Sequence, residues 1–95
     1  MSERIDKFRE VVELAHRCKA KHAESVPVVE MFGSKTVWEG VVEAFDLTGH
    51  AKAKRCYAWS YHDGKETQYV TVLELPPVTS ARTAVQAAIV SKAQK

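Results

Sequence analysis

The dipeptide Asp63-Gly64 constrains the fold of this chain more than any other feature. It lies between two segments, residues 55–62 and 66–73, in which apolar and polar side chains alternate. An Asp-Gly pair in that setting is the strongest short-range signal for a β-hairpin, because both central residues of a type I′ turn need positive φ angles. The chain is therefore expected to contain an antiparallel strand pair here.

The first strand of this hairpin carries large aromatic residues at every second position: Tyr57, Trp59 and Tyr61. Side chains alternate between the two faces of a strand, so these rings share one face. The opposite face carries the small residues Cys56 and Ala58. The hairpin thus has a bulky aromatic face and a face of small side chains.

The expected loop also sets the pairing of the two strands. With Asp63 and Gly64 as the two loop residues, His62 faces Lys65 and Trp59 faces Gln68. A four-residue loop keeps the same side chains on each face, whereas a three-residue loop exchanges the partners.

Helices are predicted at both ends of the chain. Residues 3–22 have apolar side chains at a spacing of three and four, and Pro27 ends this pattern because its ring disfavours a helical residue before it. Thr79 or Ser80 is expected to cap a second, alanine-rich helix that extends to about Ala93. The apolar positions of the two helices are Ile5, Phe8, Val11, Val12, Ala15 and Cys18, and Ala81, Ala84, Val85, Ala88 and Ile89.

The segment between the first helix and the hairpin is rich in branched and aromatic residues and is expected to be extended. Gly33 and Ser34 interrupt it, so residues 36–47 form one strand and residues 28–32 form either a short extra strand or a single helical turn. The element order predicts one α+β domain over residues 1–95. We expect a two-layer sandwich of order α-β-β-β-α: an antiparallel three-stranded meander sheet, with both helices on one face.

A sheet of this kind has one face covered by helices and one open face. If the helices cover the face of small side chains, then Tyr57, Trp59 and Tyr61 lie on the open face, with Trp38 on the neighbouring strand. Alternation alone equally allows the reverse arrangement, with the rings beneath the helices. An exposed apolar cluster of this size marks a partner surface. These four residues are the candidate partner-binding residues.

Residues 49–65, together with the element order, resemble the double-stranded RNA-binding domain. In that family a loop with glycine and histidine leads through basic residues into the second strand, followed by a tight turn, a third strand and an alanine-rich helix. The resemblance covers about half of the chain and implies RNA binding through the loop cations. The matching loop residues are Gly49, His50, Lys52, Lys54 and Arg55.

The chain departs from this family at the start of the last helix. The family has a lysine cluster there that grips phosphates, whereas VTSARTAVQAA contains Arg82 as its only cation. Phosphate contacts supply most of the affinity for nucleic acids. RNA binding is therefore the alternative function, with Tyr57 or Trp59 stacking on bases.

Catalytic and metal-binding patterns are weak. Cys18 and His22 have the i,i+4 spacing of a chelating pair, but a zinc site needs further ligands at recognisable spacings. Cys56 and His50 lack the oxyanion features that a cysteine nucleophile requires. We expect two unpaired thiols, no metal, no cofactor and no enzymatic activity.

Composition narrows the class of protein. The chain is 45% hydrophobic and 27% charged with a net charge of +2, which is ordinary for a globular protein. It lacks an apolar stretch of the roughly 18 residues that cross a bilayer, and its charged first residues do not resemble a secretory signal. We therefore expect a cytoplasmic, non-catalytic interaction module without membrane contact. It is expected to self-associate, or to bind another protein, through the aromatic face or the edge of the first strand.

Overall fold

The computed structural model describes residues 3–93, with side chains described for residues 3–91. It contains two helices and one antiparallel sheet with the strand order β1-β2-β3-β4. The α+β class and the antiparallel sheet are confirmed, and the short extra strand proves to be the end of a long β1. The elements are α1 (Glu3–His16), β1 (Lys19–Phe32), β2 (Lys35–Thr48), β3 (Arg55–Asp63), β4 (Glu66–Leu73) and α2 (Ala81–Ala93).

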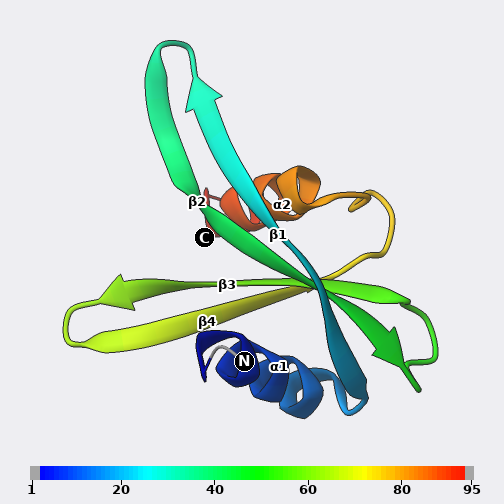
Figure 1. Ribbon diagram of the computed structural model, residues 1–95. Helices are drawn as coiled ribbons and strands as arrows, with labels where there is room; N and C mark the ends of the chain where they lie inside the picture. Colours follow the sequence, from blue (N-terminus) through cyan, green and yellow to red (C-terminus); the bar gives the residue numbers. More distant parts are fainter. Residues whose placement is uncertain (1–2, 94–95) are drawn as a thin grey trace.

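The sheet consists of two hairpins that diverge. β1 and β2 pair along their whole length, as do β3 and β4, but β2 and β3 share only the pairs between Glu43–Asp46 and Arg55–Ala58. Beyond these pairs the hairpins separate into two arms, the β1–β2 arm and the β3–β4 arm, and α2 lies in the angle between them (Figure 1). We call this angle the fork.

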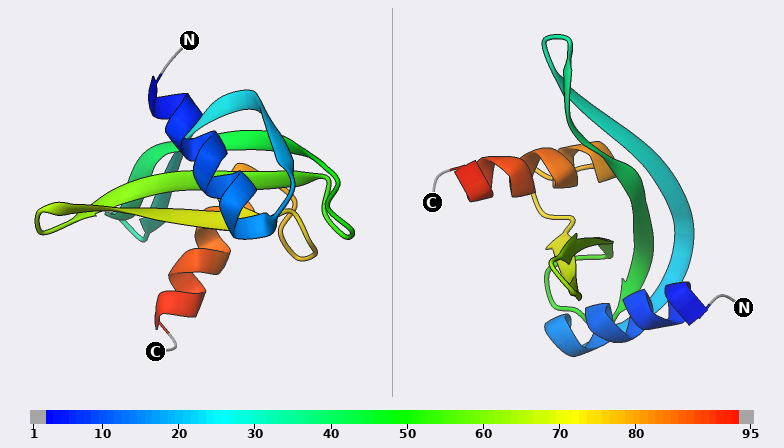
Figure 2. Two further views of the ribbon diagram at one scale, coloured as in Figure 1. Left: turned by 90° about the horizontal axis from the view of Figure 1, so that it is seen from below. Right: turned by 90° about the vertical axis from the view of Figure 1, so that its left-hand side faces the viewer.

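The two helices cover opposite faces of the sheet. α1 packs Phe8 on the face that carries Cys56 and Ala58, whereas α2 packs on the face that carries Tyr57 and Trp59. The expectation of both helices on one face is therefore wrong, and the centre of the molecule has three layers (Figure 2). The physical reason is that β3 is apolar on both faces, so each face needs its own cover.

The first helix is shorter than the sequence predicts. It ends at His16 because Arg17 adopts a φ of 51°, a left-handed conformation that stops the helical ladder. The chain then enters β1, where Ala20 pairs with Leu47. Pro27 lies within β1 and does not end a helix; an edge strand tolerates proline because the missing N–H faces outward.

Both hairpin turns use a glycine as the first of two loop residues. Gly33 has a φ of 64° and Gly64 a φ of 66°, as the first loop position of a type II′ turn requires. The second loop is therefore Gly64-Lys65, and Trp59 pairs with Val70 where the sequence predicted Gln68. The shift is an even number of residues, so the predicted division of side chains between the two faces is correct.

The second helix begins where the sequence predicts. The Ser80 hydroxyl accepts a hydrogen bond from the Thr83 N–H at 3.3 Å, and the Ser80 carbonyl accepts one from the Ala84 N–H at 3.0 Å. These bonds satisfy N–H groups that the first helical turn leaves without partners. The cap fixes the start of α2 beside β1, where Arg82 reaches the Val29 carbonyl.

Candidate functional site

An apolar groove runs between α2 and the two arms, and we call it the fork groove. Its volume is about 760 Å³. β2, β3, β4 and α2 all contribute to its walls, and among the described side chains that line it none is a lysine, arginine, histidine, aspartate or glutamate. The lining residues are Trp38, Trp59, Tyr61, Val70, Val72, Val85, Ala87, Ala88, Ile89 and Ser91.

Two indole rings form the floor of the groove where the arms separate. The last pair between β2 and β3 joins Glu43 to Ala58, so Trp59 is the first residue of β3 beyond the shared ladder. Trp38 projects from the part of β2 that has already left β3, and its ring meets that of Trp59 edge to face with centroids 5.8 Å apart. The contact fills the space that backbone pairing leaves open.

Gly40 makes room for this arrangement. A Cβ atom at that position would lie 3.0 Å from Cη2 of Trp38 and 3.3 Å from its Cζ2. The indole therefore folds over the backbone of β2, two residues from its own Cα, and turns its edge toward Trp59. The contact between the two indoles cannot be predicted from the sequence, because it depends on the divergence of the arms.

The structure brings three of the four candidate partner-binding residues together. Trp38, Trp59 and Tyr61 line the fork groove, and Tyr61 is 43% exposed at its rim. Trp59 and Tyr57 are only 4% and 3% exposed, because α2 covers them. The open aromatic face is therefore wrong for these two rings, and the reverse arrangement, with a helix over them, is correct.

Tyr57 lies deeper and has a structural contact. Its hydroxyl donates a hydrogen bond to the carboxylate of Glu74, just beyond the end of β4. Burial, together with Glu74, raises the pKa of Tyr57 to about 12. The phenol therefore keeps its proton and acts as a donor that ties β3 to the segment after β4.

The outer edge of β1 is protected against pairing with another strand. Pro27 has no N–H, and Arg82 of α2 donates from Nη2 to the carbonyl oxygen of Val29 at 3.1 Å. Pro27 and Val29 are two positions apart in β1, so the nitrogen of Pro27 and the carbonyl of Val29 point to the same side of the strand. Proline and occupied carbonyls are common devices against edge-to-edge association.

The basic loop of the RNA alternative is arranged around His50. Nδ1 of His50 accepts hydrogen bonds from the N–H groups of Lys52 and Ala53, at 3.1 and 2.9 Å. Lys52 and Lys54 are exposed, whereas Arg55 pairs with Asp46 at 3.1 Å. Arg55 lies beside Tyr57, but Tyr57 and Trp59 are buried beneath α2 and are not open for stacking on bases.

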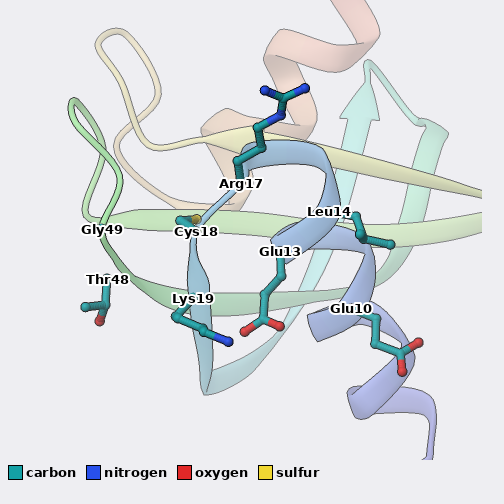
Figure 3. Close-up of a pocket in the computed structure, with 8 residues that line it drawn as sticks. All are labelled: Glu10, Glu13, Leu14, Arg17, Cys18, Lys19, Thr48 and Gly49. Atoms are coloured by element: carbon teal, nitrogen blue, oxygen red, sulfur yellow. The ribbon is translucent and has the colours of Figure 1, made fainter.

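A second hollow lies beside the end of α1 (Figure 3). It has a volume of about 700 Å³ and is lined partly by Glu10, Glu13, Arg17 and Cys18. The side chains of Glu10 and Arg17 point away from each other, so they do not converge on a ligand (Figure 3). Burial and the charge of Glu13 raise the pKa of the Cys18 thiol, which leaves it protonated and a poor nucleophile at neutral pH.

The second cysteine is buried, and the two candidate metal ligands on the expected first helix do not lie on the same element. Cys56 is buried, and burial raises the pKa of its thiol to about 12. Within residues 3–93, no group of three or more histidine, cysteine, aspartate and glutamate side chains is placed to hold a metal ion. Cys18 and His22 do not share a helix, because the chain enters β1 between them.

A buried carboxylate, Glu43, gathers polar partners that the sequence does not predict. Glu43 is fully buried and accepts hydrogen bonds from Nη1 of Arg4 at 2.5 Å, from Nε2 of His22 at 2.9 Å and from the Ser25 hydroxyl. Burial alone would raise the pKa of this carboxyl, but the bonds from Ser25, Arg4 and His22 and the charge of Arg4 outweigh it and lower the pKa. Both oxygens are occupied, so Glu43 joins α1 to the β1–β2 arm and is not a free base.

Comparison of the chain with protein-family models, with curated proteins and with solved structures gives no significant match. In the part of the chain that the structure describes, neither helix is long and apolar enough to cross a membrane. The function therefore has to follow from the chemistry of the fork groove and the surfaces around it.

Proposed function

We propose that this protein is a non-catalytic interaction module that binds an apolar segment of a protein partner in the fork groove. One observation carries the proposal: two arms that share only a short ladder direct Trp38, Trp59 and Tyr61 onto one groove whose described lining residues are all uncharged. The groove volume of about 760 Å³ is within the range of about 300–1,000 Å³ that is typical of ligand sites.

The polar groups of the groove support binding and not catalysis. Among the described lining residues, polar side-chain atoms occur only in Trp38, Trp59, Tyr61 and Ser91. Acid–base chemistry requires a group that titrates near neutral pH, and covalent chemistry requires an activated nucleophile. The lining instead suits an aromatic or aliphatic side chain, and tryptophan and tyrosine are the residues that most often dominate binding energy at such sites.

The walls of the groove are held in place from both sides. Arg82 of α2 bonds to the Val29 carbonyl, and Gln86 donates from Nε2 to the buried carboxylate of Glu30 at 2.5 Å. These bonds attach α2 to the β1–β2 arm, while its apolar face packs on Tyr57 and Trp59. A preorganised groove loses little conformational entropy on binding.

RNA binding, implied by the resemblance to the double-stranded RNA-binding domain, is the second candidate. It is favoured by the exposed side chains of Lys52 and Lys54. Their loop begins at Gly49, which borders the hollow that Arg17 and Lys19 also line. These cations would contact phosphates without base stacking, so the affinity would fall steeply with salt. The groove is the stronger candidate because its aromatic residues converge on one site, whereas the two rings of the RNA hypothesis, Tyr57 and Trp59, are too buried to stack on bases.

A neutral apolar probe tests the proposed function. N-phenyl-1-naphthylamine, whose emission rises in apolar surroundings, is titrated into the protein and into the variant Ser91→Phe, which narrows the groove mouth. The control Ser60→Phe makes the same change at an exposed position on the opposite face of β3. We expect saturable binding that Ser60→Phe preserves and Ser91→Phe weakens at least tenfold.

The proposed function is wrong if the probe fails to saturate or if the two serine variants behave alike. A short RNA duplex is titrated in parallel at low salt. RNA binding that Lys52→Ala/Lys54→Ala abolishes, without any probe binding, would replace the groove function with the second candidate.

A further inference from the structure

The β1–β2 arm ends in an exposed aromatic side chain. Phe32 directly precedes the Gly33-Ser34 loop and is 81% exposed, and the neighbouring Met31 is also exposed. The arm projects beyond α2, so the loop lies at an extremity of the molecule (Figures 1 and 2). A tight two-residue loop restricts the backbone that carries this side chain, which gives it the form of an anchor for a pocket.

The chain also exposes more surface than a monomer of its size. Its accessible surface is 6702 Å² for a mass of 10.6 kDa, whereas a typical folded monomer of this mass exposes about 5,500 Å². A stable interface buries about 800 Å² on each partner. The two projecting arms therefore leave enough surface for one such interface.

We infer that the partner of the fork groove is a second copy of this chain, with Phe32 of each copy seated in the groove of the other. This inference rests on the proposed function, because the site is the same. The match is chemical: an uncharged apolar anchor meets a groove that is lined by aromatic and aliphatic side chains.

Charges beside the anchor and beside the groove are complementary. Lys35 is paired with Phe32 across the turn. Asp63 and Glu66 are paired with each other at the end of the β3–β4 arm, on the face that carries Tyr61. Like charges directly opposite each other are unfavourable, and a lysine from a partner would relieve that repulsion.

Two copies that exchange Phe32 in this way form a closed dimer. Trp38 and Phe32 belong to the same arm, and Trp38 is three residues from Lys35, or about 10 Å along β2. Two arms that lie antiparallel thus bring each tip to the groove of the other copy, which gives a two-fold contact without free ends. The arms meet through side chains, since Pro27 and Arg82 protect the edge of β1.

Sedimentation analysis from 1 to 200 µM tests the inference. The wild-type protein is expected to form dimers, and Phe32→Ser is expected to raise the dissociation constant at least tenfold. Leu14→Ser is the matched control, because Leu14 on α1 is also 81% exposed but lies away from the arm and the groove. Circular dichroism checks that each variant is folded.

A mixing experiment identifies the contact itself. Phe32→Ser lacks the anchor but keeps the groove, whereas Ser91→Phe keeps the anchor but has a narrowed groove. Each is expected to be monomeric alone, and an equimolar mixture is expected to contain heterodimers because one anchor-in-groove contact is intact. A mixture that stays monomeric, or single variants that dimerise like the wild type, would overturn the inference.

The probe separates this inference from the proposed function. Phe32→Ser has an unoccupied groove, so it is expected to bind N-phenyl-1-naphthylamine at least as tightly as the wild type. Probe binding by a wild-type protein that is monomeric at 200 µM overturns the second-copy partner and leaves the groove function standing. The absence of both probe binding and dimers overturns both.

Discussion

The indole rings of Trp38 and Trp59 meet edge to face, 5.8 Å between centroids, at the point where β2 and β3 part. The contact joins two arms that are otherwise held together by a short ladder and by α2. It also forms the floor of the fork groove, so the stability of the fork and the shape of the proposed binding site depend on the same pair of side chains.

Substitution of Gly40 by alanine is expected to separate the two indoles. The added Cβ would approach Cη2 of Trp38 to 3.0 Å, and the ring has to move to relieve the contact. We expect a loss of about 1 kcal/mol in the free energy of unfolding, a changed near-ultraviolet circular dichroism spectrum and weaker probe binding. The control is Glu39→Ala, an exposed neighbour on the other face; identical spectra for the two variants would contradict the role assigned to Gly40.

Glu43→Gln is expected to destabilise the protein by about 2 kcal/mol, because it removes a charged acceptor from Arg4, His22 and Ser25 in a buried position. Glu39 lies on the same face of β2 but is exposed, and Glu39→Gln is expected to cost less than about 0.5 kcal/mol. Urea unfolding measures both values. Equal stability of the two variants would show that the Glu43 cluster does not stabilise the fold.

The stability difference between the wild type and Glu43→Gln depends on pH in a defined direction. The pKa of Glu43 is lowered in the folded protein, so its contribution is fully present above the ordinary glutamate pKa of about 4.3 and is lost as the pH falls through the folded-state pKa. The stability difference between wild type and Glu43→Gln is expected to be constant from about pH 7 to 5 and to shrink in more acidic solution. A difference that grows on acidification would contradict this assignment.

The protection of the β1 edge can be removed. Pro27→Ala restores an outward N–H, and Arg82→Ala frees the Val29 carbonyl, so the double variant is expected to associate through strand pairing. Thioflavin fluorescence and light scattering measure this association. Each single variant keeps one of the two obstacles and is the control; a double variant that stays as soluble as the singles would mean that neither residue protects the edge.

Alternation along the chain predicted which side chains share a face, but not how many layers cover them. Cys56 and Tyr57 lie on opposite faces of β3 and are both buried, which a single covered face cannot provide. Arg17 carries no sequence signal for its left-handed φ, so the predicted helix ran on into β1. The partners of Glu43 are 39, 21 and 18 residues away, and only the packing of α1 on the β1–β2 arm brings all three together. The fork groove was equally hidden, because it depends on the divergence of two hairpins.

The chain contains two tryptophans, and both contribute to the floor of the groove. A ¹H–¹⁵N spectrum of Phe32→Ser therefore shows two indole cross-peaks, which are followed during titration with N-phenyl-1-naphthylamine. We predict that both peaks move together and saturate at the dissociation constant that fluorescence gives. Indole peaks that stay in place while the probe binds would locate it elsewhere and contradict the fork groove as the binding site.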